Sequence, residues 1–365
     1  MSQGGYLVRW NLDTGERKSI RPAAESKEET LRFNWSAALA TDPYDPDTVY
    51  FGSQFVHRST DSGDTWTKIS PDLTTNEPSK QKQEESGGIT LDVTAAENHT
   101  TLTTISPSAI ERGLLWVGTD DGRLHVTRDG GKKWTSVEKN VWTLAGVPAG
   151  TWIPHVVPSP HEAGTAFVVF DDHRRGNDKT YVAKTVDYGK TWKSLASSDL
   201  EGAAFAIVQD PVDPALLFLG TERGLWWTED GGRSWHPWRH GVPAVPVYDL
   251  AIHPREHDLL IATHGRGILV LDDIRPLRSL TTEALTAPVH LFAGGAAVQA
   301  RQGQGAGSRT PGVSDFRGDN RPYGAVITYS LTSAGLPHPD EEIERARRED
   351  RRKSGKAEST GGAAE

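Results

Sequence analysis

Short apolar runs separated by turn residues recur along most of the chain. Runs such as 114–119, 165–170 and 216–221 are long enough only for a strand, and clusters of Gly, Pro, Asn, Asp and Ser lie between them. Runs of this length, bounded by turn residues, are typical of β-strands rather than helices. The pattern therefore predicts an all-β fold.

One turn motif, Ser/Thr-x-Asp-x-Gly-x-x-Trp, occurs four times, at 59–66, 127–134, 185–192 and 228–235. In such a turn an Asp side chain accepts hydrogen bonds from nearby backbone, a Gly adopts positive φ, and a Trp anchors the hairpin in a core. The motif predicts a structural role for its Asp and Trp residues, which are Asp61, Trp66, Asp129, Trp134, Asp187, Trp192, Asp230 and Trp235.

Each copy of the motif closes a unit of four predicted strands, which is the make-up of one blade of a β-propeller. The full units are 33–70, 100–138, 151–195 and 203–238. A partial unit at 6–20 precedes them, and a fifth unit at 245–275 ends without the Gly and Trp of the motif. Residues 1–300 thus predict about five and a half blades of a six- or seven-bladed ring or of a longer array. The partial unit leads us to expect further propeller repeats upstream in a longer parent protein.

The C-terminal part has a different composition. Residues 301–322 are rich in Gly and predict a linker. Residues 323–336 begin with an alternating strand and predict the start of a β domain that is cut short. Residues 337–365 are charged and then small and polar, and we expect a disordered tail. A short helix stays open as the alternative at 341–353, where both signs of charge are mixed, and the expectation of disorder applies above all to 354–365.

Composition excludes several classes of function. The chain has no Cys, so disulfides and thiolate metal sites are excluded. Its net charge of −9 argues against nucleic-acid binding, and no apolar run is long enough to insert into a membrane. The acidic turns at 42–47 and 210–214 are better explained as proline-containing hairpin turns than as calcium loops. We therefore predict no metal and no cofactor.

The turns between the second and third strands of each blade carry more charge than a plain turn requires. They lie on one rim of a propeller, where ligands usually bind. Their polar residues are Gln54, Asp120, Asp172, His173, Arg174, Glu222, Arg223, His264 and Arg266. Two interpretations stay open: these residues bind a ligand, or acidic and basic neighbours pair across blades.

Connections on the same rim add Glu97 and Trp152. The Trp152 ring could stack on a sugar or plug the channel. Glycoside hydrolysis needs two carboxyl groups about 5–10 Å apart, and the candidates for general acid and base are Asp120, Asp172 and Glu222, with Glu97 as a further carboxylate. The sequence contains no His-Glu-x-x-His zinc motif and no phosphate-binding loop.

The four turn motifs resemble the Asp-box, or BNR, repeats of bacterial sialidases, of xyloglucanase-type two-propeller hydrolases and of the sortilin luminal domain. Segments 69–74, 116–122 and 263–267 look like those of large bacterial proteins described as glycosyl hydrolase-like or sortilin-like. The resemblance implies an extracellular propeller, secreted or periplasmic, that binds or acts on carbohydrate. The alternative is a non-catalytic propeller that binds a peptide or protein. Sialidase activity is not expected, because the Arg-Ile-Pro motif of sialidases is absent.

Overall fold

The computed structural model describes residues 4–82, 98–297, 324–332 and 341–353. It divides into two compact units, residues 1–274 and 275–365, and each is described by itself. The predicted Gly-rich linker at 301–322 lies outside the described residues.

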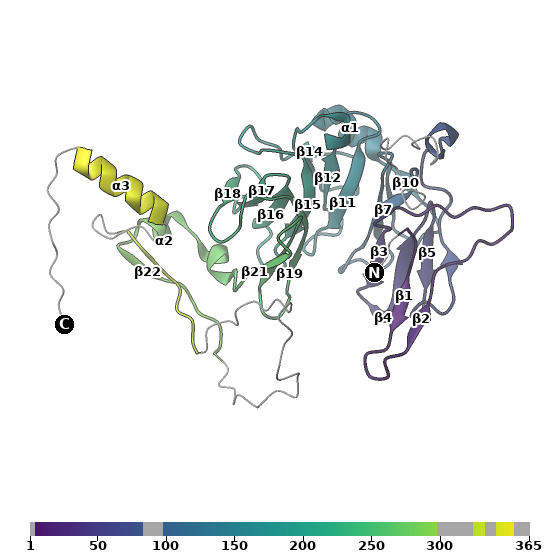
Figure 1. Cartoon of the computed structure of the whole chain (residues 1–365), viewed down its shortest axis with the longest axis horizontal. Helices are drawn as coiled ribbons and strands as arrows, with labels where there is room; N and C mark the ends of the chain where they lie inside the picture. The colour runs from purple at the N-terminus through teal and green to yellow at the C-terminus, as the bar shows by residue number, and fades with distance from the viewer. Residues whose placement is uncertain (1–3, 83–97, 298–323, 333–340, 354–365) are drawn as a thin grey trace. The chain divides into compact units, whose positions relative to one another are not determined.

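The first unit is a series of antiparallel sheets that follow one another along the chain (Figure 1). A hairpin of β1 (Val8–Trp10) and β2 (Arg17–Ser19) comes first. Four sheets of four strands follow, which we number blades 1 to 4. Blade 1 contains β3 (Leu39–Asp42), β4 (Asp45–Gly52), β5 (Val56–Ser59) and β6 (Thr67–Lys68), and blade 2 contains β7 (Leu102–Pro107), β8 (Leu115–Thr119), β9 (Leu124–Thr127) and β10 (Thr135–Ser136). Blade 3 contains β11 (Trp152–Pro158), β12 (Ala166–Asp171), β13 (Tyr181–Thr185) and β14 (Lys193–Ser194). Blade 4 contains β15 (Ala204–Gln209), β16 (Leu217–Thr221), β17 (Gly224–Thr228) and β18 (His236–Trp238).

Blade 5 has three strands, β19 (Val247–Ile252), β20 (Leu259–Thr263) and β21 (Ile268–Leu271). Its missing fourth strand matches the sequence, in which the turn motif of this unit lacks Gly and Trp. The prediction of an all-β fold built from propeller blades is confirmed. The number of blades in a complete ring stays a prediction.

Short helices lie in the connections of the first unit. They are η1 (Pro78–Lys80), α1 (Glu138–Ala145) and η3 (His173–Arg175). The helix η3 occupies the turn between the second and third strands of blade 3, so it places His173 and Arg174 on the rim that the sequence analysis singled out.

The second unit contains η4 (Arg275–Ser279), α2 (Thr282–Thr286), a strand pair and α3 (Glu341–Lys353). Strand β23 (Tyr329–Leu331) lies inside the predicted C-terminal β segment and pairs with β22 (Val289–Leu291). Helix α3 covers the mixed-charge part of the tail, for which the sequence left a short helix open. A pair four residues apart, Glu344 and Arg348, is 3.2 Å apart there and supports a helix.

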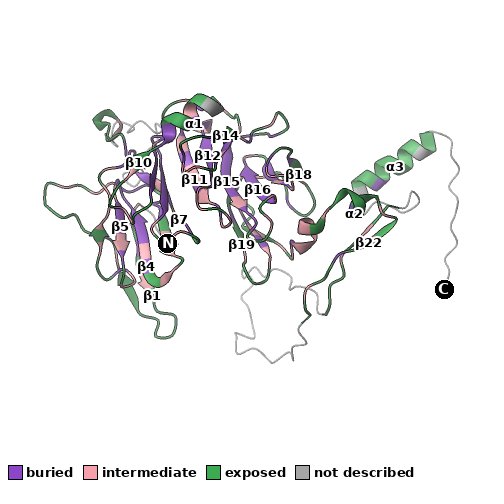
Figure 2. Cartoon of the chain, turned by 180° about the vertical axis from the view of Figure 1, so that it is seen from behind, coloured by how far each residue is buried: buried purple, intermediate pink, exposed green. Residues whose placement is uncertain are grey.

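The core of the first unit lies between blades rather than within them. The first strand of each blade contacts the first strand of the next, from β3 through β7, β11 and β15 to β19. One apolar cluster, for example, joins Trp116 of blade 2 to Phe170 and Trp192 of blade 3. Figure 2 shows the burial concentrated in strands such as β12, β15 and β16. Each sheet therefore buries its faces against its neighbours.

The Asp residue of each motif organises the turn that carries it. In the fourth copy, Asp230 Oδ1 accepts hydrogen bonds from the backbone N–H groups of Arg233 (2.7 Å) and Ser234 (3.0 Å) and from the Thr228 hydroxyl (2.8 Å). The equivalent bond from the residue before Trp recurs at Asp61, Asp129 and Asp187. The four turns therefore share one hydrogen-bonding scheme.

The Trp residue of the motif ties its blade to the preceding sheet. The indole N–H of Trp66 donates to Ile20 O (2.7 Å), that of Trp134 to Ile69 O (3.0 Å) and that of Trp235 to Leu195 O (2.9 Å). The indole of Trp192 differs, because it donates to Gly189 O within its own turn (3.1 Å).

The Gly at the fifth position of the motif contacts the same residue of the preceding sheet as the Trp does in the first two copies. A Cβ atom on Gly131 would lie 2.6 Å from Ile69 O, and one on Gly63 would lie 2.5 Å from Ile20 Cδ1. Both glycines also have positive φ, at 95° and 91°. The motif thus requires Gly for its backbone conformation and for the close approach of the two sheets.

We predict that Trp235→Phe lowers the free energy of unfolding by about 1 kcal/mol, because it removes the buried hydrogen bond to Leu195 O and keeps most of the apolar contact. Trp235→Ala should cost about 3–5 kcal/mol, since it also opens a cavity. Urea denaturation measures both changes. The matched control is Trp10→Phe, at a position that is 54% exposed; equal losses at positions 10 and 235 would contradict the role of the indole.

Candidate functional site

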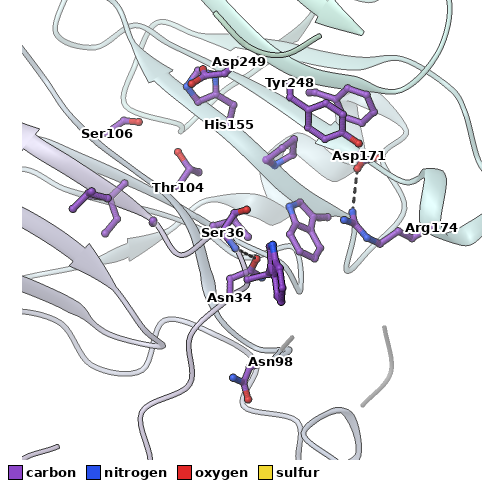
Figure 3. Close-up of a pocket in the computed structure, with 18 residues that line it drawn as sticks. Asn34, Ser36, Asn98, Thr104, Ser106, His155, Asp171, Arg174, Tyr248 and Asp249 are labelled. Carbon is purple, nitrogen blue, oxygen red and sulfur yellow. Dashed lines mark hydrogen bonds and ion pairs between the residues drawn. The ribbon is translucent and has the colours of Figure 1, made fainter. Parts of the chain in front are cut away.

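A cavity of about 780 Å³ lies against the first strands of successive blades (Figure 3). Four aromatic side chains line it, Trp35, Trp152, Phe205 and Tyr248. Its polar side chains are those of Asn34, Ser36, Asn98, Thr103, Thr104, Ser106, His155, Asp171, Arg174 and Asp249. The cavity is therefore a mixed aromatic and polar surface to which all five blades contribute.

A repeated irregularity of the first strands shapes this surface. In blades 2 to 5 the register shifts near the start of the first strand, so that one residue on that strand has no partner opposite it. The unpaired residue is Thr103 in blade 2, Phe205 in blade 4 and Tyr248 in blade 5. In blade 3 the register shift lies between Trp152 and His155 and includes Pro154. The cavity is lined by Thr103, Pro154, Phe205 and Tyr248. A β-bulge re-aims side chains in this way.

Trp152 and Arg174 form the part of the cavity wall contributed by blade 3. The Arg174 guanidinium carbon lies 4.1 Å from the centre of the Trp152 ring, and Nη1 donates to Asp171 Oδ2 at 3.2 Å. Asp171 is 4% exposed and also binds His173 Nδ1 at 2.5 Å. The hydrogen bond to Asp171 raises the pKa of His173 above its ordinary value. Asp171 therefore holds both cationic side chains in place.

A row of rings crosses from blade 3 to blade 5. Phe205 and Tyr248 are stacked, with ring centres 4.5 Å apart and planes at 8°. His173 contacts Phe205 edge-on at 5.9 Å, and His264 lies 5.8 Å from Tyr248. Tyr248 is 50% exposed. The row therefore offers a partly exposed aromatic surface at the cavity.

Glu222 borders this row. The negative charge of Glu222 contributes to raising the pKa of His173 and of Tyr248, although the Asp171 hydrogen bond and burial, respectively, are the largest causes. Its Oε2 atom is buried and has no hydrogen-bond partner among the described residues. Glu222 does not itself line the cavity, so its connection with the ring row is electrostatic.

His155 and Asp249 form a second polar pair on the wall. Burial lowers the pKa of His155, and the charge of Asp249 opposes this shift. His155 Nδ1 accepts from the Ile207 N–H at 3.3 Å, so the neutral ring carries its proton on Nε2. The Asp249 side chain accepts a hydrogen bond from the Leu250 N–H, at 2.8 Å.

Asp120 lies behind the cavity rather than on its wall. It is 2% exposed and accepts hydrogen bonds from Thr101 N (2.9 Å), Thr101 Oγ1 (2.5 Å) and Asn34 Nδ2 (3.3 Å). Burial, together with the charge of Asp121, raises the pKa of Asp120 to about 8. Asn34 lines the cavity, so the polar link from Asp120 to the cavity runs through its amide.

Two further predicted residues, Asp172 and Gln54, form hydrogen bonds with neighbouring residues of the rim. Asp172 is 4% exposed and binds Arg175 Nε at 2.5 Å and Asn177 Nδ2 at 2.7 Å. Gln54 is 3% exposed and bonds to the Arg32 N–H and Thr30 O. Neither residue lines the cavity, so their geometry is that of structural groups.

The remaining predicted residues fall into three groups. His264 and Arg266 are exposed on the turn after β20. Arg223 is also exposed and lines a separate depression of about 650 Å³ with Glu222. Glu97 lies outside the described residues. Of the predicted set, the structure therefore brings Trp152, His173, Arg174 and His264 to the cavity wall or to the ring row beside it.

Among the described residues, no group of three or more His, Asp or Glu side chains has the geometry to hold a metal ion. Over the same part of the chain, no helix is both long enough and apolar enough to cross a membrane.

Comparison with solved structures identifies the fold class as a β-propeller. The chain is similar to the GH74 xyloglucanase from Xanthomonas campestris, with a TM-score of 0.50 and 21% identity over 71% of this chain and 39% of that enzyme. It also matches the GH74 enzyme of Niastella koreensis, with a TM-score of 0.43 and 15% identity over 75% of this chain and 50% of that one. The chain thus spans about two fifths of the length of the xyloglucanase. No protein-family model and no curated protein sequence matches it.

We predict that the contribution of Asp120 to the stability of the chain falls as pH rises from about 4 to about 8, because the pKa of Asp120 is about 8 in the folded chain and about 4 in the unfolded chain. Between these two values the folded chain holds the proton that the unfolded chain has lost, so the stabilisation is complete below about pH 4 and absent above about pH 8. Urea midpoints at several pH values measure the effect. Asp120→Asn should flatten the profile, whatever its absolute stability; an equally steep profile in this variant would disprove the assignment.

Proposed function

We propose that this chain is the ligand-binding part of an Asp-box (BNR-repeat) propeller and that it binds an oligosaccharide in the cavity on the first strands. The observation that carries the proposal is the composition of the cavity wall, which combines four aromatic side chains with at least six polar side chains. A pyranose ring has apolar faces that suit aromatic rings and an edge of hydroxyl groups that needs hydrogen-bonding partners.

The geometry of individual residues supports this assignment. Tyr248 is half exposed and is held by stacking on the buried ring of Phe205, so little conformational entropy is lost when a sugar covers it. Arg174 is fixed by Asp171 while part of its side chain stays exposed. The cavity volume of about 780 Å³ lies within the range of small-molecule sites.

Hydrolysis of the bound glycan is a further step of the same proposal. None of the three candidate carboxylates lines the cavity, but Glu222 acts electrostatically on His173 and Tyr248, and its Oε2 atom is unpartnered among the described residues. Asp120 keeps a proton near neutral pH but lies behind Asn34. We propose that Glu222 is the general acid/base if the bound glycan is cleaved. The proposal that the cavity binds a glycan does not depend on cleavage.

The comparison proteins are consistent with an extracellular role, which we propose for the parent protein. One further match is the extracellular domain of a putative hybrid two-component system from B. thetaiotaomicron, with a TM-score of 0.48 and 14% identity over 74% of this chain and 34% of that one. At this similarity it carries no argument about the ligand.

A second candidate function is the binding of an extended peptide. Strand β21 pairs only with β20 among the described residues, and Ile268 and Val270 on it are 68% and 55% exposed. An edge strand of this kind can accept a peptide as an added strand. In that case binding would not involve Trp152 or Tyr248.

We predict that Trp152→Ala and Tyr248→Ala each weaken binding of the best ligand on a glycan array by about 5- to 30-fold, because each removes an aromatic surface. Isothermal titration calorimetry measures the change. Trp10→Ala, on the exposed β1–β2 hairpin, is the control and should bind like the unaltered chain. Failure to bind any glycan, or equal affinity in all three variants, would contradict the proposal.

If the array ligand is also cleaved, Glu222→Gln should lower turnover by at least about 100-fold and weaken binding much less, as expected for a group that acts in the transition state. Released reducing ends measure turnover. Cleavage that persists in Glu222→Gln would exclude this residue as the acid/base group.

A further inference from the structure

Blade 5 leaves the position of a fourth strand open along β21. The Thr263 N–H donates to Gly267 O at 2.9 Å, so the alternation of an antiparallel ladder turns the backbone groups of residues 268 and 270 away from β20. Among the described residues β21 has no other partner strand, and the side chains of Ile268 and Val270 are exposed. An extended segment can therefore pair with this edge.

The turn after β21 begins like the turn motif but does not lead into a strand. The Ile274 N–H donates to His257 O at 2.8 Å, and the equivalent N–H of each motif turn makes the same bond to a residue at or just before the start of the second strand. Arg275 and Arg278 stand where the motif has Gly and Trp, and residues 275–279 form the helix η4. In the described part of the chain, blade 5 thus has neither a fourth strand nor the Trp that precedes one.

Trp235 shows what such a Trp contacts on the preceding blade. Its indole N–H donates to Leu195 O at 2.9 Å, and its ring lies in one apolar cluster with Val182 and Leu195 of blade 3. Leu195 follows Trp192 by three residues, and its own N–H donates to Val182 O at 2.9 Å. A pair of residues at the outer end of blade 3 therefore forms the contact surface for the Trp of blade 4.

The equivalent pair on blade 4 lines an open depression. Trp238 follows Trp235 by three residues and is paired with Leu225, in the same way as Leu195 with Val182. Leu225 and Trp238 both line the separate depression of about 650 Å³ described above. Trp238 is also the last of the 12 Trp residues, so the sequence from blade 5 onward holds no Trp to fill it. The depression is thus the place where a Trp that follows β21 would lie.

The fourth strands of the other blades define the segment that fits. Each begins with Trp-x-x-apolar, at 66–69, 134–137, 192–195 and 235–238. The Trp contacts the preceding blade, and the apolar residue pairs with the third strand of its own blade at a position whose equivalent on β21 is Ile268. The charged side chains that line the depression are two carboxylates and two guanidinium groups, those of Glu201, Glu222, Arg223 and Arg239. Their charges balance, so a neutral indole is the side chain that suits it.

We propose that β21 and the depression on blade 4 together bind an extended protein segment in which a Trp is followed, three residues later, by an apolar residue. The indole occupies the depression and donates to Trp238 O, as Trp235 donates to Leu195 O, and the apolar side chain covers Ile268. The inference builds on the second candidate function, peptide binding at β21, because it names the side chains that the peptide must carry. It is independent of glycan binding in the cavity.

The test is fluorescence anisotropy on the whole chain with a capped, fluorescein-labelled peptide of residues 63–69, whose Asp64 and Lys68 balance in charge. We expect saturable binding. Trp66→Ala in the peptide should weaken it at least about 30-fold, since the main anchor is lost. A peptide with 1-naphthylalanine at position 66 keeps the ring area without the N–H and should bind about 5-fold more weakly.

Two variants of the chain address the two parts of the site. Ala244 is exposed and lines the depression, so Ala244→Trp should fill it and weaken the peptide at least about 10-fold. Val270→Pro removes an N–H at the open edge and should weaken it about 5- to 10-fold. Ala24→Trp, at another exposed position, and Val270→Thr, which keeps the N–H, are the matched controls and should bind like the unaltered chain. Urea midpoints identify a variant that fails to fold, and Ala244→Trp decides the matter if Val270→Pro is such a variant.

Each other outcome overturns the inference in a recognisable way. If the peptide does not bind, the site does not exist. If the Trp66→Ala peptide binds as tightly as the unaltered one, the edge accepts any extended segment and only the second candidate function stands. If N-acetyltryptophanamide alone matches the heptapeptide, the depression is a site for a small aromatic ligand. If the chain self-associates and Trp10→Ala abolishes this, the occupant is a second copy of the chain. Glycan binding on the array is unaffected by any of these results.

Discussion

The contact between each turn motif and the preceding sheet is the interaction on which the first unit depends. In three of the four copies the indole N–H donates to a backbone carbonyl of that sheet, and the Gly at the fifth position allows the two backbones to approach. The sheets bury both faces against neighbours, so none has a core of its own. Because this contact runs from a blade to the one before it, each blade that carries the motif is stabilised by the sheet that precedes it in the chain.

The sequence was sufficient for the blades because the motif acts locally. The Asp residue, the turn it binds and the Trp lie within eight positions, as at 228–235, and their spacing alone marks a hairpin between two strands. In the fifth unit, whose motif lacks Gly and Trp, the sheet has no fourth strand among the described residues. In the tail, mixed charge alone left helix and disorder open, and pairs such as Glu344 with Arg348 accompany the helix α3.

The candidate site was predicted only in part, because a position on the rim does not determine whether a side chain faces the cavity or forms hydrogen bonds within the protein. Asp120 and Asp172 occupy equivalent turns, yet each bonds to groups within the rim, such as Thr101 and Arg175. Phe205 and Tyr248 were missed because the candidates were sought on turns and connections, whereas these two residues lie at register shifts within β15 and β19. One extra residue in a strand changes the face that a side chain occupies, and no local pattern signals it.

These extra residues give the first strands two separate roles. Their regular positions, such as Val247 and Leu250, are buried within the unit, whereas the bulged Tyr248 between them faces the cavity and has no partner across the sheet. A substitution at a bulge can therefore change what the cavity accepts without repacking an interface between blades. Related chains could diversify their ligands at a few such positions while keeping one scaffold, in the way that antibodies vary loops on a constant framework.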